Sequence, residues 1–181
     1  FIKKNKKWFE KVVKKNSMNK FEITDIEKNI ENIERKIGIN LSKNQKVIEF
    51  SPLMFKILHI ISKKINTLNG GLLIIDYGYL EKKMKDSLQS IYKHKYNDIL
   101  NNIGKSDITY SLNFLLIKKF VKKFNLKVEG LTTQRNFLTK LGIINRAEIL
   151  TANLNFLKKA DIYHRLKRLI DKNSMGEMFK V

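Results

Sequence analysis

Asp76, Tyr77 and Gly78 are the residues of this sequence whose types and position best suit chemistry. They follow a run of four apolar residues, 72–75, which a pair of glycines precedes. Such a run predicts a strand over residues 71–76 that is buried on both faces, as in a parallel sheet. Open α/β sheets bind ligands beyond the carboxyl ends of their strands, so we expect a ligand site at this polar end. The alternative is an ordinary turn after a buried strand, with Asp76 capping the next segment.

A histidine, a second acid and a hydroxyl stand further along the chain. His94 ends an alternating segment, 86–94, that could be a strand or a loop lying along the site. Asp107 and Thr109 follow a glycine turn that we expect to begin a helix, where Asp107 could serve the site or cap the turn. The chain has no cysteine, and His59 has no second His, Asp or Glu one helical turn away, so we expect no metal site.

Hydrophobic periodicity and turn residues predict strands and helices around these candidates. We expect strands at residues 8–13, 47–50, 127–133 and 176–181, and helices at 24–37, 52–68, 113–124, 134–141, 146–150 and 154–170. Thr24 with Glu27 would make a capping box, while Ser51 and Pro52 are typical of a helix start. This order of elements indicates an α/β fold of the doubly wound kind.

The composition fits one domain with a strongly basic surface. The chain has 181 residues, 43% of them hydrophobic, and a formal net charge of +20. Such an excess ordinarily indicates nucleic acid or an anionic membrane as a partner. Here the cations are mostly lysines spread along the chain, and arginine is scarce. Arginine is the better residue for phosphates and base edges, because its planar guanidinium can donate two parallel hydrogen bonds. We therefore expect no nucleic-acid partner. No apolar run approaches the roughly 18 residues of a membrane span.

Seven stretches of the chain, in order, resemble one known family. They are Trp8 to Val13, Glu49 to Pro52, Gly71 to Tyr79, Asp86 to Gln89 with His94, Gly104 with Asp107 to Thr109 and Phe114, Gln134 with Phe137-Leu138, Leu141 to Ile143 and Arg146, and Met175-Gly176 with Phe179-Lys180. The family is that of the MidA-like S-adenosylmethionine-dependent methyltransferases, which includes a mitochondrial protein-arginine methyltransferase that assists respiratory complex I assembly. Departures are mild, with Lys11 where arginine is usual and Ser87 where threonine is usual.

The resemblance implies a fold and a place within it. Residues 1–181 resemble the C-terminal part of one Rossmann-like class I methyltransferase domain, with a mixed α/β sheet. The last strand, 176–181, would run antiparallel to 127–133 and lie beside 71–76, and residues 134–172 would be a helical insertion that caps the cleft. The family's Gly-rich cofactor loop has no counterpart here. Since the chain opens on Phe1 rather than Met, we expect this loop upstream of residue 1 and expect the chain alone to be inactive.

The resemblance also implies an activity, which we expect to be protein-arginine methylation linked to respiratory complex I assembly, with S-adenosylmethionine as the cofactor. Candidate catalytic residues are Asp76, Tyr77, Asp107 and His94; Gly78 is a candidate cofactor contact, and Gln134, Arg135 and Thr109 are candidate substrate contacts. The partner would be a protein, with a complex I subunit as one candidate. The location would be the cytoplasm of a bacterium, or the mitochondrion if the source is eukaryotic. The alternative is a non-catalytic basic module for RNA or an acidic protein, against which the scarcity of arginine argues.

Overall fold

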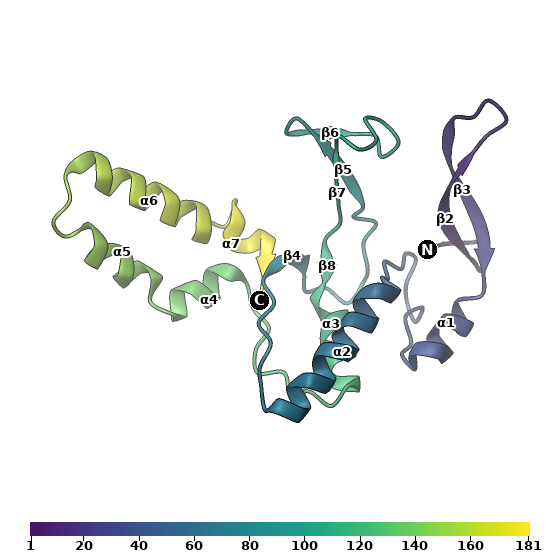
Figure 1. The fold of residues 1–181 in the computed structure, drawn as a ribbon, viewed down its shortest axis with the longest axis horizontal. Helices are drawn as coiled ribbons and strands as arrows, with labels where there is room; N and C mark the ends of the chain where they lie inside the picture. Colours follow the sequence, from purple (N-terminus) through teal and green to yellow (C-terminus); the bar gives the residue numbers. More distant parts are fainter. The chain divides into compact units, whose positions relative to one another are not determined.

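The computed structural model describes residues 1–181, which form two compact units (Figure 1). The first unit contains residues 1–57 and 81–111, and the second contains residues 58–80 and 112–181. The buried apolar residues of the first unit are Trp8, Ile30, Ile37, Leu41 and Ile48, and those of the second are Leu58, Tyr79, Phe114, Leu116, Ile117, Phe120, Val121 and Ala147. Helices and strands are both present, so the predicted mixed α/β class is confirmed. None of the helices has both the length and the apolar content to cross a membrane.

The first unit begins with an antiparallel sheet of three strands. These are β1 (Ile2–Lys4), β2 (Lys7–Lys15) and β3 (Phe21–Lys28), in that order. The turn between β2 and β3 is closed by Asn16, whose side-chain oxygen accepts hydrogen bonds from two backbone N–H groups, at 3.0 Å each. The strand predicted at residues 8–13 is therefore confirmed, because it lies inside β2.

The helix predicted from Thr24 begins later than expected. Residues 21–28 form β3, in which Thr24 lies opposite Val12, and the helix α1 (Ile30–Ile37) starts after Asn29. The Asn29 side chain caps α1 by accepting a hydrogen bond from Asn32 N at 3.3 Å, and Gly38 ends it at a φ of 63°. The apolar residues spaced by three and four suit a helix, but eight residues paired along β2 outweigh that local pattern.

The rest of the first unit carries a second small sheet. Its strands are β5 (Gln89–Tyr92), β6 (Lys95–Asn97) and β7 (Asp107–Thr109), in the order β6-β5-β7. Segment 86–94 thus contains a strand, which is one of the two alternatives, strand or loop, predicted for it. The helix start predicted at Asp107 is wrong, because residues 107–109 pair antiparallel with β5 instead. The strand predicted at 47–50 is also wrong, since only Val47 forms a bridge, with Ile2.

Two further helices follow, and the first of them begins in the first unit and continues into the second. Helix α2 (Pro52–Leu68) is capped by Ser51, whose Oγ accepts a hydrogen bond from Met54 N at 3.1 Å, as predicted. Helix α3 (Phe114–Lys123) begins at Asn113, as predicted, and buries Phe120 completely. The His59 ring of α2 stacks on Phe124 with centroids 4.6 Å apart, so His59 is a packing residue.

The sheet of the second unit places the last strand between two earlier segments. Its order is β8 (Leu112–Asn113), β4 (Asp76–Tyr79) and β9 (Phe179–Lys180), with β4 parallel to β8 and antiparallel to β9. On the other side of β9, Thr132 and Val181 exchange two backbone hydrogen bonds of 2.9 Å each. The predicted neighbours of the last strand are confirmed only at their ends, because most of the predicted strand 127–133 is irregular and β9 meets the predicted strand 71–76 only at Asp76.

The strand predicted at residues 71–76 is wrong in its position. The structure begins β4 at Asp76, and no strand pairs with residues 72–75. Three of these side chains are open to solvent, with 42% of Leu72, 61% of Leu73 and 42% of Ile75 exposed, and Ile74 is half-buried. A strand needs a hydrogen-bonded neighbour, and none of the strands of this chain lies beside this run. Asp76 and Tyr77 therefore begin a strand instead of following one.

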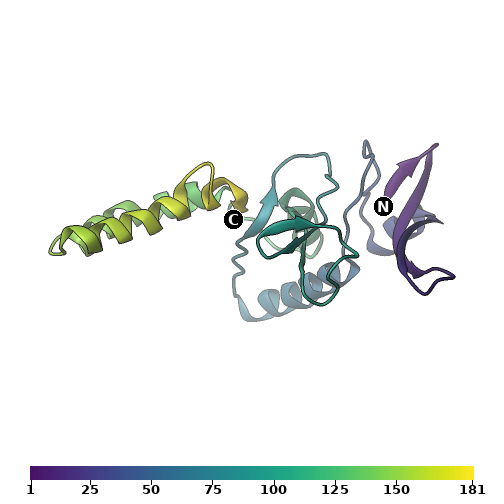
Figure 2. The same cartoon turned by 90° about the horizontal axis from the view of Figure 1, so that it is seen from above.

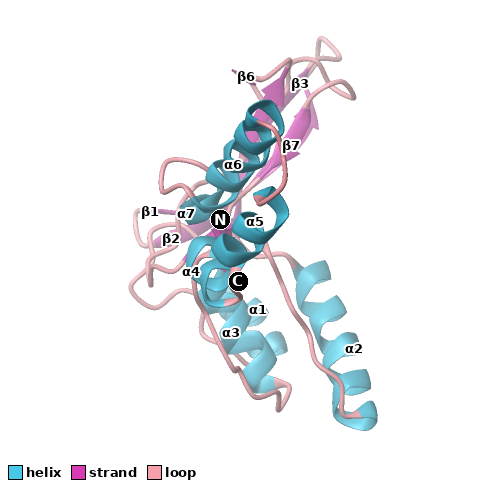
Figure 3. Ribbon diagram, turned by 90° about the vertical axis from the view of Figure 1, so that its left-hand side faces the viewer, coloured by secondary structure: helices cyan, strands magenta, loops and turns pink.

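Four helices complete the second unit (Figures 2 and 3). They are α4 (Gln134–Lys140), α5 (Ile143–Thr151), α6 (Phe156–Ile170) and α7 (Met175–Met178). Figure 2 shows α6 running alongside α5, and both pack on α4. Thr133 caps α4 and Asn155 caps α6, each through its side-chain oxygen. The three helices predicted between residues 134 and 170 are confirmed, whereas the start of the predicted last strand is the helical turn α7.

Candidate functional site

Strand β4 carries three of the predicted site residues side by side. Asp76 is exposed, and its Oδ1 accepts a hydrogen bond from Tyr77 N at 2.7 Å. The Tyr77 ring, 45% exposed, lies against Phe179 of β9 with centroids 4.1 Å apart. The sheet therefore fixes the Tyr77 ring and leaves a free carboxylate beside it. Because adjacent residues of a strand point to opposite faces, a cationic group can be oriented by the Asp76 carboxylate on one face or by the Tyr77 phenol on the other.

Gly78 has a packing reason to be glycine. A Cβ atom at this position would lie 2.5 Å from the Leu112 carbonyl oxygen and 2.7 Å from the ring of Phe114. Both distances are shorter than any side chain accepts, so only glycine lets β8 and α3 approach β4 so closely. The predicted cofactor contact of Gly78 stays a prediction, since the packing alone accounts for this residue.

Lys180 lies beside the candidate site, and its position was not predicted from the sequence. It lies directly opposite Asp76 in the β4–β9 ladder, so the two side chains share one face of the sheet. Its side chain is only 9% exposed, forms no salt bridge, and donates a hydrogen bond to the Glu177 carbonyl. Its ammonium group therefore has a backbone carbonyl as its partner and not a carboxylate. The match of Phe179-Lys180 to the family was the only signal in the sequence.

Three other predicted residues lie in the first unit. Asp107 and Thr109 stand on β7, both exposed, and Thr109 Oγ1 accepts a hydrogen bond from Gln89 at 3.2 Å. His94 occupies the turn between β5 and β6, at a φ of 62°. It is exposed and has no carboxylate partner. The structure thus brings Asp107, Thr109 and His94 to one small sheet, whereas Asp76 and Tyr77 belong to the other unit.

The two residues of α4 that are predicted to contact substrate differ in whether their polar groups are available to a ligand. Gln134 is buried, and its amide nitrogen donates to the Leu169 carbonyl at 2.9 Å, which ties α4 to α6. Arg135 is partly exposed and forms no salt bridge. Only Arg135 therefore keeps its polar group available, and the substrate role of both residues stays a prediction.

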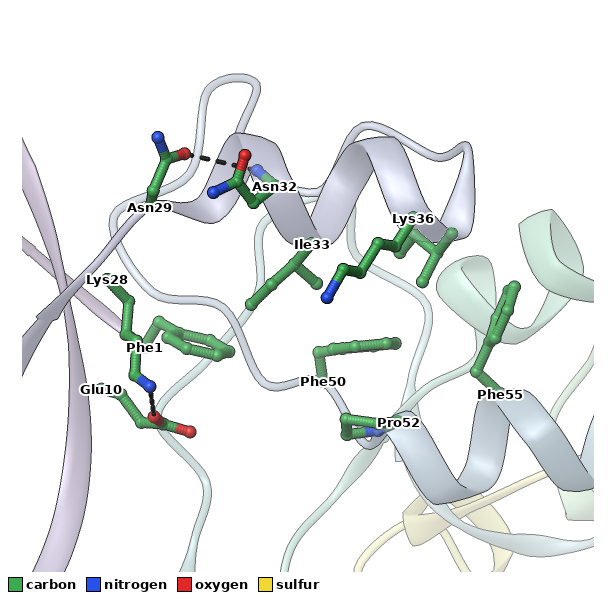
Figure 4. A pocket seen from close by; sticks show the side chains of 11 residues that line it. Phe1, Glu10, Lys28, Asn29, Asn32, Ile33, Lys36, Phe50, Pro52 and Phe55 are labelled. Carbon is green, nitrogen blue, oxygen red and sulfur yellow. Dashed lines mark hydrogen bonds and ion pairs between the residues drawn. The ribbon is translucent and has the colours of Figure 1, made fainter.

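The first unit contains two pockets. The larger, of about 440 Å³, is lined by Ile33 and Lys36 of α1 and by Phe50, Pro52 and Phe55, among others (Figure 4). The smaller, of about 270 Å³, is lined by the carboxylates of Glu10, Glu49 and Asp86 and by Tyr110, among others. Two of these carboxylates already have cationic partners, since Glu10 pairs with Lys28 at 3.3 Å and Asp86 with Lys11 at 2.9 Å. The histidines and acids of the chain form no cluster that could hold a metal ion.

Glu49 organises the wall of the smaller pocket. Its carboxylate accepts hydrogen bonds from Ser87 N at 2.7 Å, Ser87 Oγ at 2.6 Å and Leu88 N at 3.1 Å. Ser87 Oγ in turn accepts from Ser111 N at 2.9 Å. One carboxylate therefore holds three segments of the chain together. Sequence reasoning noted Glu49 and Ser87 only as parts of family motifs and assigned them no role.

We predict that Glu49→Ala lowers the free energy of unfolding by about 2 kcal/mol, because it leaves donors to a charged acceptor unsatisfied. Glu129→Ala is the matched control, since Glu129 pairs only with Lys127 on the surface, and we expect a change below about 0.5 kcal/mol. Urea denaturation of both variants measures the difference. Equal effects would mean that the 86–88 segment is held by other contacts.

Comparison with known proteins identifies the family to which the sequence of this chain is similar. The model described as "Putative S-adenosyl-L-methionine-dependent methyltransferase" matches residues 1–132. The mitochondrial protein arginine methyltransferase NDUFAF7 of Xenopus tropicalis is 28% identical over 134 residues, which are 74% of this chain and 31% of that protein. The Caenorhabditis elegans homologue is 33% identical over 98 residues, which are 54% of this chain and 23% of that protein.

Solved structures share the fold. One crystal structure from Burkholderia thailandensis superposes with a TM-score of 0.76 at 21% identity and covers 99% of this chain and 49% of its own. A second, bound to S-adenosyl-homocysteine, superposes with a TM-score of 0.74 at 20% identity and covers 99% of this chain and 47% of its own. The chain thus spans about half the length of these structures and about a third of the first curated relatives. The chain belongs to the MidA-like family of S-adenosylmethionine-dependent methyltransferases.

Proposed function

We propose that this chain is the substrate side of a methyltransferase that transfers a methyl group to arginine side chains of a protein. The observation that carries the proposal is the family match over residues 1–132, together with relatives that are named protein arginine methyltransferases. S-adenosylmethionine would supply the methyl group. The residues present fit only part of a cofactor site, because the chain has no Gly-rich loop and Gly78 packs against Phe114.

The proposed role of Asp76 is to hold the acceptor guanidinium. Its exposed carboxylate would neutralise the positive charge and keep the reacting nitrogen in a productive orientation. Tyr77 would line the opposite face of the strand, where its ring is held by Phe179. Asp107 is proposed as a second acid and His94 as the group that accepts the proton released from the guanidinium.

Helices α4 to α6 are proposed to recognise the protein substrate. They would be the helical insertion of residues 134–172, and they lie between Thr133 and β9 in the sequence. Arg135 and Thr109 are the proposed substrate contacts, with Gln134 supporting them through its bond to Leu169. A respiratory complex I subunit is one candidate substrate. The proposed location is the cytoplasm of a bacterium or, in a eukaryote, the mitochondrion, as for the curated relatives.

We predict that this chain alone binds S-adenosylmethionine with a dissociation constant above about 1 mM. This corresponds to a binding free energy weaker than about −4 kcal/mol. The physical reason is that the loop expected to hold the amino-acid end of the cofactor is not among these residues. Isothermal titration calorimetry with S-adenosylmethionine and S-adenosylhomocysteine measures this affinity. Micromolar binding would show that the main cofactor site lies within residues 1–181.

A basic binding module is the competing function, and the net charge of +20 favours it. Such a module would bind random RNA with an affinity that falls steeply as salt rises, because counterions are released. Fluorescence anisotropy between 50 and 200 mM salt distinguishes the two functions. A methyltransferase fragment should show only weak binding with a shallow dependence on salt.

A further inference from the structure

The connection between α5 and α6 presents four large apolar side chains to solvent. Phe156 and Leu157, in the first turn of α6, are 81% and 77% exposed, more than any other large apolar residue of the second unit. Ile149 and Leu150, in the last turn of α5, are 69% and 47% exposed. Because α5 and α6 run side by side, all four residues lie at the same end of the hairpin that the two helices form (Figures 1 and 2). We call these four residues the hairpin tip.

The hairpin is held together by other residues. Ala147 and Thr151 of α5 are buried, and the Thr151 hydroxyl lies 3.5 Å from the Tyr163 hydroxyl of α6. The turn itself is closed by Asn155, whose side-chain oxygen accepts a hydrogen bond from Lys158 N at 3.1 Å. The side chains of the hairpin tip are therefore not needed for the fold of the hairpin. A cluster of exposed apolar side chains of this kind is typical of an interaction surface.

The charges next to the hairpin tip are positive. Residues 149–160 include Lys158 and Lys159 and contain no acidic residue. The acids that flank this segment are Glu148 and Asp161, and Asp161 is already in a salt bridge of 2.9 Å. Exposed phenylalanine and leucine beside lysines, without acids, are the features of segments that bind the boundary between lipid headgroups and acyl chains. Lysines near such a surface are attracted by anionic lipids.

We propose that the hairpin tip binds the surface of an anionic lipid bilayer, with Phe156 and Leu157 at the headgroup–acyl boundary and Lys158 and Lys159 against lipid phosphates. The first turn of α6 would meet the bilayer end-on, so all four side chains would reach the boundary, the lysines by extending their stems. This binding goes beyond methyl transfer and does not depend on it.

Charge favours a bilayer over a protein as the occupant of the hairpin tip. A segment that carries an arginine for methylation is cationic, and the lysines beside the tip would repel it. A second copy of this chain is disfavoured for the same reason, since each copy has a net charge of +20. An anionic bilayer complements both the charge and the apolar character of the tip.

The test is co-sedimentation of the 181-residue chain with vesicles of equal parts phosphatidylcholine and phosphatidylserine, and with vesicles of phosphatidylcholine alone. We expect binding to the anionic vesicles that weakens as salt rises. Phe156→Asp should lower this affinity by about tenfold or more, because a charged side chain cannot enter the acyl boundary. Since Phe156 is exposed and Asp suits the first turn of a helix, the melting temperature should stay within about 2 °C. Lys158→Ala combined with Lys159→Ala should lower the affinity about 30-fold, or roughly fivefold for each lysine.

Each variant has a matched control. Leu141→Asp makes the same change of charge at a residue that is 68% exposed and precedes α5, at the other end of that helix from the hairpin tip. Lys122→Ala combined with Lys123→Ala removes two exposed lysines from the end of α3. The Leu141 variant should keep the affinity within about twofold, and the α3 pair should weaken binding far less than the pair on α6.

Fluorescence of Phe156→Trp reports directly on insertion. Its emission should shift to shorter wavelength with anionic vesicles, and Trp8, the one native tryptophan, is buried and should not respond. No binding to the anionic vesicles, an unchanged emission on binding, or equal losses in the tip variants and their controls would overturn the proposal. A homodimer that Phe156→Asp dissociates would also overturn it, because the hairpin tip would then be an interface between copies of the chain.

Discussion

Asp76→Asn should reduce methyl transfer about 100-fold in the proposed methyltransferase that contains this chain, a loss typical of one electrostatic contact to the reacting group. The substitution keeps the shape of the side chain and removes its charge. Its amide oxygen can still accept the hydrogen bond from Tyr77 N, and the residue is exposed, so the melting temperature should stay within about 2 °C. Transfer of tritium from labelled S-adenosylmethionine to arginine in cell-extract protein measures the rate.

Two further variants test whether a loss of activity comes from the charge of Asp76 itself. Glu129→Gln removes an exposed carboxylate that pairs only with Lys127, and it should leave the rate unchanged. Tyr77→Phe keeps the ring against Phe179 and removes only the hydroxyl, so it tests whether the phenol contributes. Full activity of Asp76→Asn with an unchanged melting temperature would exclude Asp76 from the catalytic residues.

Local signals predicted most helices correctly because their ends are determined by nearby residues. Ser51 caps α2, Asn113 caps α3 and Gly142 precedes α5 at a φ of 81°, and all three contacts or angles involve residues within one helical turn. The same reasoning failed at Thr24, where the threefold and fourfold spacing of isoleucines suggested a helix. Pairing with β2 determines that segment, and the partner lies across a turn that periodicity does not detect.

The candidate site was harder to predict because its residues are placed by long-range pairing. The order of the last strand could be predicted from the family resemblance, and β9 does lie between β4 and Thr132. The buried position of Lys180 opposite Asp76 could not, since it depends on the register of that pair. Nor could the three hydrogen bonds to Glu49, because they connect residues about 38 positions apart. Sequence motifs identified these residues without indicating their partners.

Gly78→Ala should lower the free energy of unfolding by about 3 kcal/mol, at the upper end of what overpacking a close contact costs. The added methyl group would lie 2.5 Å from the Leu112 carbonyl oxygen, which is backbone and cannot rotate away, and 2.7 Å from the Phe114 ring, which is buried. Relief would require β8 to separate from β4, and Asn113, which caps α3, would move with it.

Gly71→Ala is the control from the same stretch, because nothing lies within 4 Å of its added Cβ and its φ is not positive. It should be neutral or stabilise the fold by up to about 1 kcal/mol, by restricting the unfolded chain. Urea denaturation of the two variants gives both values. A stable Gly78→Ala protein would mean that the close packing of β8 does not require glycine. That result would strengthen the case for a cofactor contact at Gly78.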